Sequence, residues 1–346
     1  MRALGAVPVT SNQLSATRAR VLAALGAIET SEDVIAAVTQ LAIAGALRLP
    51  LPGAGDTATR LRALSEIAAV DLSMARIAEG HLDAIAILAE ARCPARDGLY
   101  GVWAADAPDA KVEAERVPGG WRLRGRKRYC SGARGLDRAL VTAATGEVGR
   151  LFDLDLRQGG VSPIPDTWQA VGMAATDSLS VMFNVEVADD AVVGAPGFYL
   201  ARPGFWHGAV GVAACWYGGA LGAARMVRAQ LARSEPTEHQ LAHLGAIAAI
   251  CETLQASLDS AAREIDAGAS AIDAGRMRAL RVRHVVEQGC QEVLSRSGRA
   301  GGTSPLAFDR AHARRAADLI VYLRQHHAER DLAALGRAVL DSPPWS

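Results

Sequence analysis

Cysteine is scarce in this sequence and is not arranged in pairs. No C-x-x-C motif joins any of the five cysteines, and an odd number of scattered cysteines argues against both a disulfide framework and a cysteine-based zinc site. We therefore predict buried free thiols, a reducing cytoplasmic location and no metal site. The cysteines are Cys93, Cys130, Cys215, Cys251 and Cys290.

An excess of charge of either sign is also missing. The 37 lysines and arginines balance 37 aspartates and glutamates, so no overall field draws the protein towards nucleic acid or an anionic membrane. The first ten residues contain one arginine and no long apolar core, so no secretory signal is predicted. Residues 203–224 contain no charged side chain, but their glycines and His207 make them weakly hydrophobic. That pattern predicts a close-packed buried helix rather than a membrane span.

Motifs that bind nucleotide phosphates are absent as well. No G-x-G-x-x-G follows a strand pattern and no P-loop is present, so a cofactor held by a Rossmann domain is not predicted. At 346 residues the chain is too long for one ordinary core, which predicts two or three packed units.

The hydrophobic period changes twice along the chain. Residues 11–94 and the chain from Gly208 onward repeat apolar side chains at helical spacing, whereas 98–200 contain short alternating runs, most strictly in 178–187. Helices, then strands, then helices is an α+β order rather than an alternating β-α-β order.

We therefore expect three domains. They are an N-terminal helical domain (1–97), a middle antiparallel β domain (98–203) and a C-terminal four-helix bundle (204–346). The bundle helices are predicted at 208–233, 237–268, 276–298 and 309–340.

Two segments of the middle region place small polar residues at strand ends. Residues 121–133 alternate apolar and basic side chains and end in Ser131-Gly132, and residues 168–178 lead through Thr176 into the next strand. A strand that ends in a small hydroxyl residue and a glycine lets a flat ligand approach the backbone closely. Each segment alone is an ordinary β-turn, but the pair, in this order and at this spacing, is distinctive.

Together these two segments resemble the middle domain of the acyl-CoA dehydrogenase superfamily of flavoproteins, and the likeness in element order covers nearly the whole chain. The resemblance implies an FAD-dependent oxidoreductase that acts on the CH–CH group of an acyl thioester or a similar substrate. It also implies a homo-oligomer, a dimer or tetramer, in which the cofactor contacts a neighbouring subunit. An electron-transfer protein or a flavin reductase is the expected redox partner.

The resemblance assigns residues to the flavin ring. It implies a hydroxyl from Ser131, an aromatic ring from Tyr129 and backbone groups from Trp103–Ala104, with Gly132 and Thr176 at the two strand ends. A hydroxyl at the ring tunes the charge of the reduced flavin. The Thr-Glu-Pro that usually follows the strand at Trp103 is missing.

At the pyrophosphate of the cofactor the resemblance implies Arg233, Gly301 and Gly302. The Phe-Gly that usually follows this arginine is missing. Without the resemblance, residues 298–302 read as a helix C-cap and turn.

The catalytic glutamate of the superfamily has no counterpart at either of its usual positions. Aligning Asp318 with the aspartate of the family's last helix puts the base at His326 or His327, and at Glu329 if the register slips. From its spacing His326 equally reads as a core histidine on a helical face. A histidine beside a flavin suits proton transfer near neutral pH.

Flavin-dependent monooxygenases of the same superfamily replace this glutamate by histidine and use a second histidine from the N-terminal helices, where His81 stands. Three functions therefore remain open. A flavin-dependent dehydrogenase is the main prediction, and a monooxygenase or hydroxylase is the alternative. The third is a flavin-less protein that binds acyl groups or serves as a scaffold.

Overall fold

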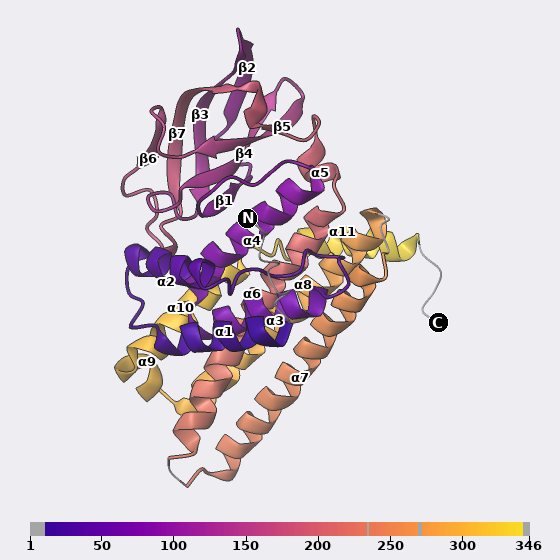
Figure 1. Cartoon of the computed structure of the whole chain (residues 1–346). Helices are drawn as coiled ribbons and strands as arrows, with labels where there is room; N and C mark the ends of the chain where they lie inside the picture. The colour runs from indigo at the N-terminus through magenta and orange to yellow at the C-terminus, as the bar shows by residue number, and fades with distance from the viewer. Residues whose placement is uncertain (1–10, 234, 269–271, 342–346) are drawn as a thin grey trace, which may run out of the picture.

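The computed structural model describes residues 11–233, 235–268 and 272–341. In this part of the chain helices come first, strands follow between Tyr100 and Val193, and helices occupy the remainder. Figure 1 shows the sheet at one end of the molecule, the long C-terminal helices extending away from it, and the N-terminal helices lying across them below the sheet. The mixed α+β order follows the predicted change of period.

The N-terminal helices begin at strong capping residues. Thr30 and Asp33 form a capping box at one helix, and the Asp71 side chain accepts the Met74 N–H at another. Such caps satisfy backbone N–H groups that have no partner within the helix. The helices are α1 (Ser11–Ala24), α2 (Ser31–Ile43), α3 (Thr57–Val70) and α4 (Leu72–Glu90).

The strands form one eight-stranded sheet with the order β6-β7-β3-β2-β4-β5-β8, and β1 pairs with β4. β4 and β5 form the hairpin that the sequence predicts at 138–155. The strands are β1 (Tyr100–Trp103), β2 (Val112–Val117), β3 (Gly120–Cys130), β4 (Arg138–Thr145), β5 (Val148–Asp155), β6 (Val161–Ile164), β7 (Leu179–Ala188) and β8 (Val192–Val193).

The antiparallel pair of β3 and β7 positions the predicted ligand site. Leu179, Val181, Phe183 and Val185 are buried on one face of β7, as the alternation predicts. The pairing shifts register between Lys127 and Cys130 of β3, so a bulge precedes the strand end. A bulge bends a strand and re-aims the residues that follow it.

The C-terminal part is a bundle in which α6 occupies the centre. Residues 203–224 lie within this helix and are largely buried, as predicted. Its glycines allow close approach, because a Cβ at Gly218 would lie 2.3 Å from the Ser65 carbonyl oxygen. The helices are α5 (Phe198–Ala201), α6 (Gly204–Leu231), α7 (Glu238–Asp266), α8 (Ile272–Gly301), α9 (Ser304–Phe308), α10 (Arg310–Leu323) and α11 (Glu329–Leu340).

The predicted continuous helix at 309–340 is wrong. α10 ends at Leu323 and α11 starts at Glu329, with Ala328 between them at a φ of 43°. The Asp331 carboxylate accepts the His327 N–H (3.2 Å). A side chain therefore provides the hydrogen-bond partner for this backbone group where the chain turns into α11. The helix therefore ends without a proline or glycine.

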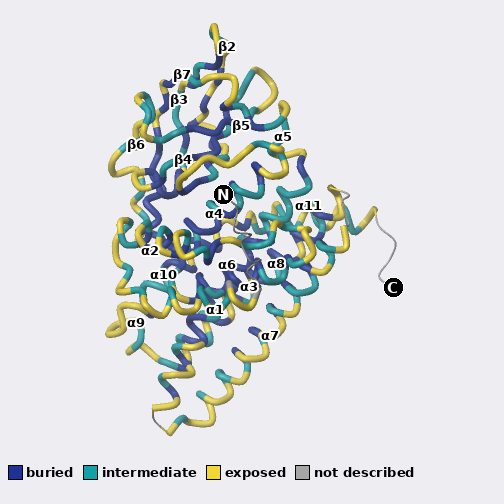
Figure 2. The backbone as a smooth tube through the Cα atoms, in the orientation of Figure 1, coloured by how far each residue is buried: buried dark blue, intermediate teal, exposed yellow. Residues whose placement is uncertain are grey.

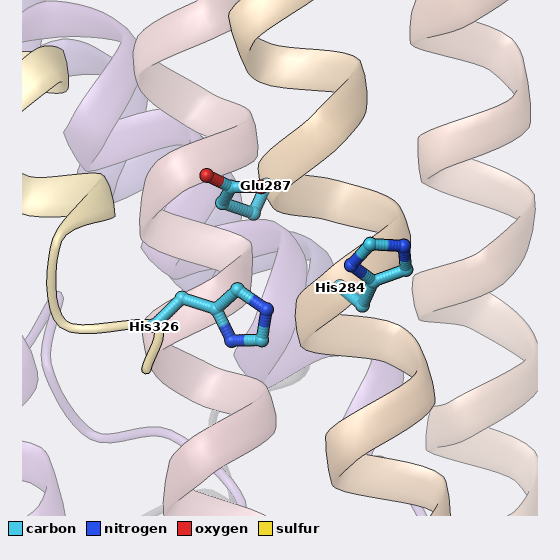
Figure 3. A group of neighbouring side chains, drawn as sticks. All are labelled: His284, Glu287 and His326. Atoms are coloured by element: carbon cyan, nitrogen blue, oxygen red, sulfur yellow. The ribbon is translucent and has the colours of Figure 1, made fainter. Parts of the chain in front are cut away.

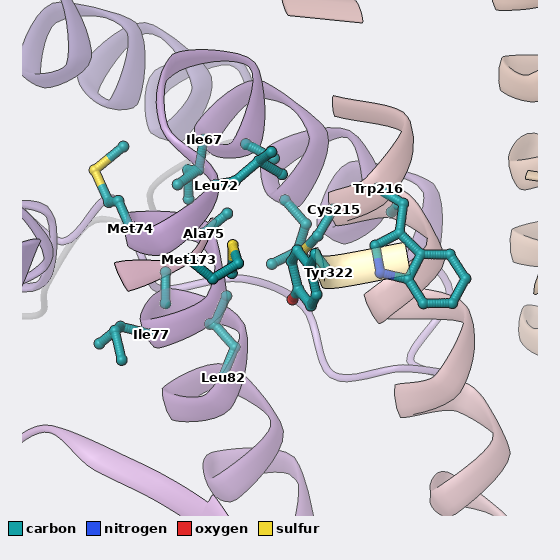
Figure 4. Close-up of a cluster of buried hydrophobic side chains, with 14 of the residues drawn as sticks. Ile67, Leu72, Met74, Ala75, Ile77, Leu82, Met173, Cys215, Trp216 and Tyr322 are labelled. Atoms are coloured by element: carbon teal, nitrogen blue, oxygen red, sulfur yellow. The ribbon is translucent and has the colours of Figure 1, made fainter. Parts of the chain in front are cut away.

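The interior of the molecule is continuous across the helices and the sheet. Figure 2 shows buried backbone where the sheet meets the helices and along the centre of the bundle, while α7 is exposed along much of its length. Figure 4 shows part of this core, where Leu82 of α4 points towards Tyr322 of α10 and Ile77 lies on the other side of α4. Burying each large apolar side chain contributes about 1.5–3 kcal/mol to folding.

α7 differs from α6 in its surroundings. Among the described helices it alone is long and apolar enough to cross a membrane by length and composition, and 22% of that stretch is buried. Its inner face packs through Ile247, Leu254 and Leu258, whereas Leu241 and Ala248 are exposed.

Candidate functional site

Three hydroxyl groups meet where β3 ends and β7 begins. Ser131 Oγ lies 2.9 Å from Ser178 Oγ, and Ser178 Oγ lies 2.8 Å from Thr176 Oγ1. The two loops are also joined by their backbones, since the Gly132 N–H donates to the Thr176 carbonyl (2.7 Å). The sequence-predicted strand ends are therefore neighbours in space, although Ser178 was not assigned a role.

One assignment of the hydroxyl protons starts from Thr176, which donates to the Met173 carbonyl (2.7 Å). In the other two contacts either oxygen can be the donor. Each hydroxyl has one proton to donate and two lone pairs, so in this assignment Ser178 donates to Thr176 and Ser131 donates to Ser178. Ser131 then has lone pairs left for a ligand.

Trp103 supports the same strand end from the sheet side. Its indole Nε1–H donates to the Ser131 carbonyl (3.0 Å), and its ring lies edge-on to Phe183 at 6.4 Å. The buried Lys127 ammonium donates to the Ala105 carbonyl (3.2 Å) and to the Thr142 hydroxyl (2.7 Å). Burial lowers the pKa of Lys127. These bonds fix the backbone on both sides of the half-buried Ala104.

A cavity of about 250 Å³ lies beside the two strand ends, next to Gly132 and Thr176. Gly132 and Thr176 line one side, and apolar side chains of α2 and α4, including Ile35 and Ile77, line the other. Its size is below the roughly 300–1,000 Å³ of ordinary ligand pockets. It therefore has room for part of a large cofactor.

Two residues at the end of β3 adopt a positive φ. Tyr129 has a φ of 61° within the bulged segment and its side chain is exposed. Gly132 has a φ of 72°, and a Cβ there would lie 2.7 Å from Leu136 Cγ. A residue other than glycine is uncommon at positive φ, and such residues cluster at functional sites. The strain marks the same strand end that the sequence singles out.

The residues predicted at the pyrophosphate lie elsewhere. Arg233 is exposed after α6, and Gly301 and Gly302 close α8, at the end of the bundle away from the sheet (Figure 1). The Gly302 N–H donates to the Gly298 carbonyl at a φ of 66°, which is the helix C-cap that the sequence also allows. Within one chain these residues do not adjoin Ser131.

His81 joins α4 to the sheet. Its Nδ1 accepts the Tyr100 N–H of β1 (3.2 Å), and burial, followed by the charge of Arg60, lowers its pKa to about 4. It is therefore neutral at pH 7. Its catalytic role stays a prediction, and its contact with β1 is structural.

The two C-terminal histidines occupy different environments. His326 lies in the turn after α10, not on the helical face used to predict it, and is 4% exposed against the Trp216 ring. Burial, followed by the charge of Arg283, lowers the pKa of His326. The His327 side chain is 56% exposed, and Glu329 is exposed at the start of α11. None of these three side chains lines the cavity beside Gly132 and Thr176.

Other residues hold the site without having been predicted. Asp318 was used to set the register of the last helix, and it accepts the Met173 N–H (2.5 Å), which docks the 168–178 loop onto α10. Arg134 forms a bidentate pair with Asp177 beside the cavity (2.7 and 2.9 Å). Neither partner is near the other in sequence, so no local pattern reveals these bonds.

Comparison with known proteins confirms the fold. No protein-family model matches the chain. A 100-residue segment is 38% identical to a dibenzothiophene monooxygenase of Rhodococcus erythropolis, covering 27% of this chain and 24% of that protein's length.

Two solved structures are similar over nearly all of the chain. A dibenzothiophene monooxygenase from Paenibacillus sp. A11-2, in complex with FMN and indole, has a TM-score of 0.76 at 21% identity and covers 96% of both chains. A methanesulfinate monooxygenase from Pseudomonas fluorescens has a TM-score of 0.78 at 19% identity, with 98% of this chain and 99% of that chain covered. The fold is therefore acyl-CoA dehydrogenase-like, as the resemblance implies, while the predicted domain boundaries stay a prediction.

Proposed function

We propose that this protein is a flavin-dependent monooxygenase that takes reduced FMN from a separate flavin reductase. The observation that carries the proposal is the direction of the hydroxyl chain. Ser131 commits its proton to Ser178 and offers lone pairs, which suits a ligand that brings an N–H group. A reduced flavin carries such a group at its central ring, and an oxidised flavin carries a bare nitrogen there.

The residues at the strand ends fit the ring end of a flavin. Trp103 and Lys127 hold the backbone around Ala104, and the hydroxyl chain and the apolar cavity wall lie on either side of Gly132. When bound, the reduced flavin supplies two electrons to O₂, so that one oxygen atom enters the substrate and the other leaves as water. The apolar wall excludes bulk water from that compartment.

FMN is proposed in place of the predicted FAD. The dibenzothiophene monooxygenase structure of the same fold contains FMN. The residues predicted to contact an FAD pyrophosphate, Arg233, Gly301 and Gly302, lie at the opposite end of the bundle from Ser131. An FAD site would therefore need these residues from a neighbouring subunit.

Dehydrogenation of an acyl thioester, the main sequence prediction, is less well supported. That reaction needs a base beside the flavin to remove a proton from carbon. Glu329 is exposed, and the contacts of His326 with Trp216 do not overlap with those of Ser131 with Ser178 and Trp103. The similar proteins reported above are monooxygenases.

We also propose that the protein is a cytoplasmic homo-oligomer. α6 packs inside its own chain and offers no surface for a second subunit. The exposed apolar face of α7, with Leu241 and Ala248, supports the proposal, since apolar surface of this kind is typical of subunit contacts.

Monooxygenation and dehydrogenation can be told apart by the compound that reduces the flavin. We would supply FMN, NADH, a separate flavin reductase and isotopically labelled O₂, with indole as the probe. The proposal predicts labelled product that depends on the reductase. Anaerobic bleaching of the bound flavin by an acyl-CoA, without a reductase, would overturn it in favour of a dehydrogenase. A protein that binds no flavin in either redox state would be the flavin-less alternative.

A further inference from the structure

α8 presents two metal-ligating side chains on one face. His284 and Glu287 are three residues apart, a spacing that places helical side chains side by side. His326, from the turn after α10, approaches the same face, and its ring centroid lies 5.9 Å from that of His284. One imidazole nitrogen from each histidine and one carboxylate oxygen of Glu287 all lie within 4.8 Å of one another. Figure 3 shows the two imidazole rings facing one another beside α8.

His326 is buried without a hydrogen-bond partner for its ring nitrogens. The residue is 4% exposed, and neither ring nitrogen forms a hydrogen bond. Leaving a buried polar group unsatisfied costs about 1–3 kcal/mol. Burial, followed by the charge of Arg283, lowers the pKa of His326, which favours the neutral form that binds metals.

We propose that His284, Glu287 and His326 bind a divalent transition-metal ion, with zinc as the preferred ion. Two imidazoles and one carboxylate are a common zinc ligand set, with a fourth position open to water. Ligand atoms around tetrahedral zinc lie roughly 3.3 Å apart, given zinc–ligand distances of about 2.0–2.1 Å. The side chains therefore need to close by about 1.5 Å, which rotation about side-chain bonds supplies.

A carboxylate stands behind one of the proposed ligands. Asp331 Oδ2 lies 3.4 Å from His326 Nδ1, which leaves the Nε2 of His326 for the metal. Metal-binding histidines usually present their second nitrogen to a carboxylate, which orients the ring and raises its basicity. The same aspartate accepts the His327 N–H, so it also shapes the turn that delivers His326.

Arg324 competes with the metal for Glu287. Its Nη2 lies 2.6 Å from Glu287 Oε1, but the arginine side chain is 56% exposed and can move into solvent. Gln288 donates to the other carboxylate oxygen (2.9 Å) and can stay as an outer contact. Arg283 is fixed by the carbonyls of Ala209 and Gln325. When the Arg324 side chain moves into solvent, the two carboxylates of Glu287 and Asp331 and the guanidinium of Arg283 give the site a net charge of −1.

This site does not rest on the proposed flavin chemistry. A base must touch the substrate, whereas a metal ligand need not. A metal ligand can be fully buried. The ion would tie the turn between α10 and α11 to α8, and binding would stabilise the folded chain. Metal binding and a role as catalytic base use the same lone pair of His326, so the proposal replaces the base role predicted for it.

The test is a titration of the full chain with Co²⁺ and Zn²⁺ after dialysis against a chelator. We expect one Co²⁺ to bind per chain and to give the visible absorption bands of four-coordinate Co²⁺. Zn²⁺ should displace the Co²⁺, and bound metal should raise the Tm. His284→Ala, His326→Ala and the nearly isosteric Glu287→Gln should each weaken binding by more than about the 10–100-fold typical of outer contacts.

Two further variants make the result specific. Arg324→Ala removes the competitor and should strengthen binding, a change of sign that general loss of stability does not produce. His239→Ala, an exposed histidine of α7, should leave binding unchanged. The proposal is overturned if no metal binds at micromolar concentration, if binding survives the loss of His284 and His326, or if Arg324→Ala weakens it.

Discussion

Ser131 is proposed to donate its one proton to Ser178, an assignment that would favour one redox state of a flavin over the other. A serine whose proton is free serves a bare nitrogen, while one whose proton is committed serves an N–H. The sequence predicts Ser131 at the flavin but not the assignment of its proton, which is argued from Thr176 and the Met173 carbonyl.

Removal of the Ser131 hydroxyl should weaken the binding of reduced flavin more than the binding of oxidised flavin. A hydrogen bond contributes about 0.5–1.5 kcal/mol, so Ser131→Ala should raise the Kd for reduced FMN by roughly threefold to tenfold. Anaerobic fluorescence titration measures both states. An unchanged Kd for reduced FMN would remove Ser131 from the site.

Gly132 should resist substitution more than a glycine of matched conformation. Gly132 and Gly146 have φ values of 72° and 70°, but a Cβ at Gly146 meets no atom within 4 Å, whereas one at Gly132 meets Leu136 at 2.7 Å. Both alanine variants carry backbone strain, and only Gly132→Ala adds overpacking of about 1–3 kcal/mol. Urea unfolding of both variants isolates that difference, and equal losses would contradict the packing described at the strand end.

His81 should make stability depend on pH in the acid range. Its folded pKa of about 4 lies below the unfolded value of ~6.5, so the unfolded chain binds the proton first. Its contribution is complete above about pH 6.5 and is lost as the pH falls towards 4, on the order of 2–3 kcal/mol in total. His81→Gln should flatten this fall in the free energy of unfolding between pH 6.5 and 4, and an unchanged slope would assign the effect to other groups.

At the scale of elements, local patterns predict what local forces decide. The alternation of 178–187 gives β7, and Thr237 with Gln240 forms a capping box at the start of α7. The break between α10 and α11 contains neither proline nor glycine, and the helical spacing continues across it, so the sequence does not predict it. His284 and Glu287 carry a helical spacing that is common on exposed faces, and it gains meaning when the unpredicted turn brings His326 to them.

The loop that carries Thr176 should depend on α10. Asp318 is buried and accepts the Met173 N–H, so Asp318→Ala leaves that donor unpaired and should cost about 3 kcal/mol. Asp259→Ala removes an aspartate from a pair with the exposed Arg62 and should cost at most ~1 kcal/mol. Urea unfolding measures both, and a loss at Asp318 no larger than at Asp259 would contradict the docking of the loop.

At the scale of the whole molecule, the sequence predicts the order of helices and strands but not which faces are left open. The glycines of α6 predict close packing but do not name the partner, which is α3, because Gly218 meets the Ser65 backbone. The sequence of α7 does not show which of its apolar residues are covered, and part of that face is exposed. Which side of an apolar helix a chain covers is decided by tertiary packing.

If a second copy covers α7, a charge placed there should separate the subunits. We expect light scattering at micromolar concentration to give at least a dimer, and Ala248→Arg to shift it towards the mass of one chain. A wild-type protein that scatters as a monomer of 36.2 kDa would contradict the proposed assembly.

The most direct test of the proposed function compares anaerobic binding of reduced and oxidised FMN by the wild-type protein and by Ser178→Ala. The hydroxyl chain predicts that the wild type binds reduced FMN about tenfold or more tightly, a difference of about 1.4 kcal/mol. Ser178→Ala frees the Ser131 proton and should bring the two affinities together by strengthening the oxidised form. Equal or tighter binding of oxidised FMN by the wild type, unchanged in Ser178→Ala, would contradict a site built for reduced flavin.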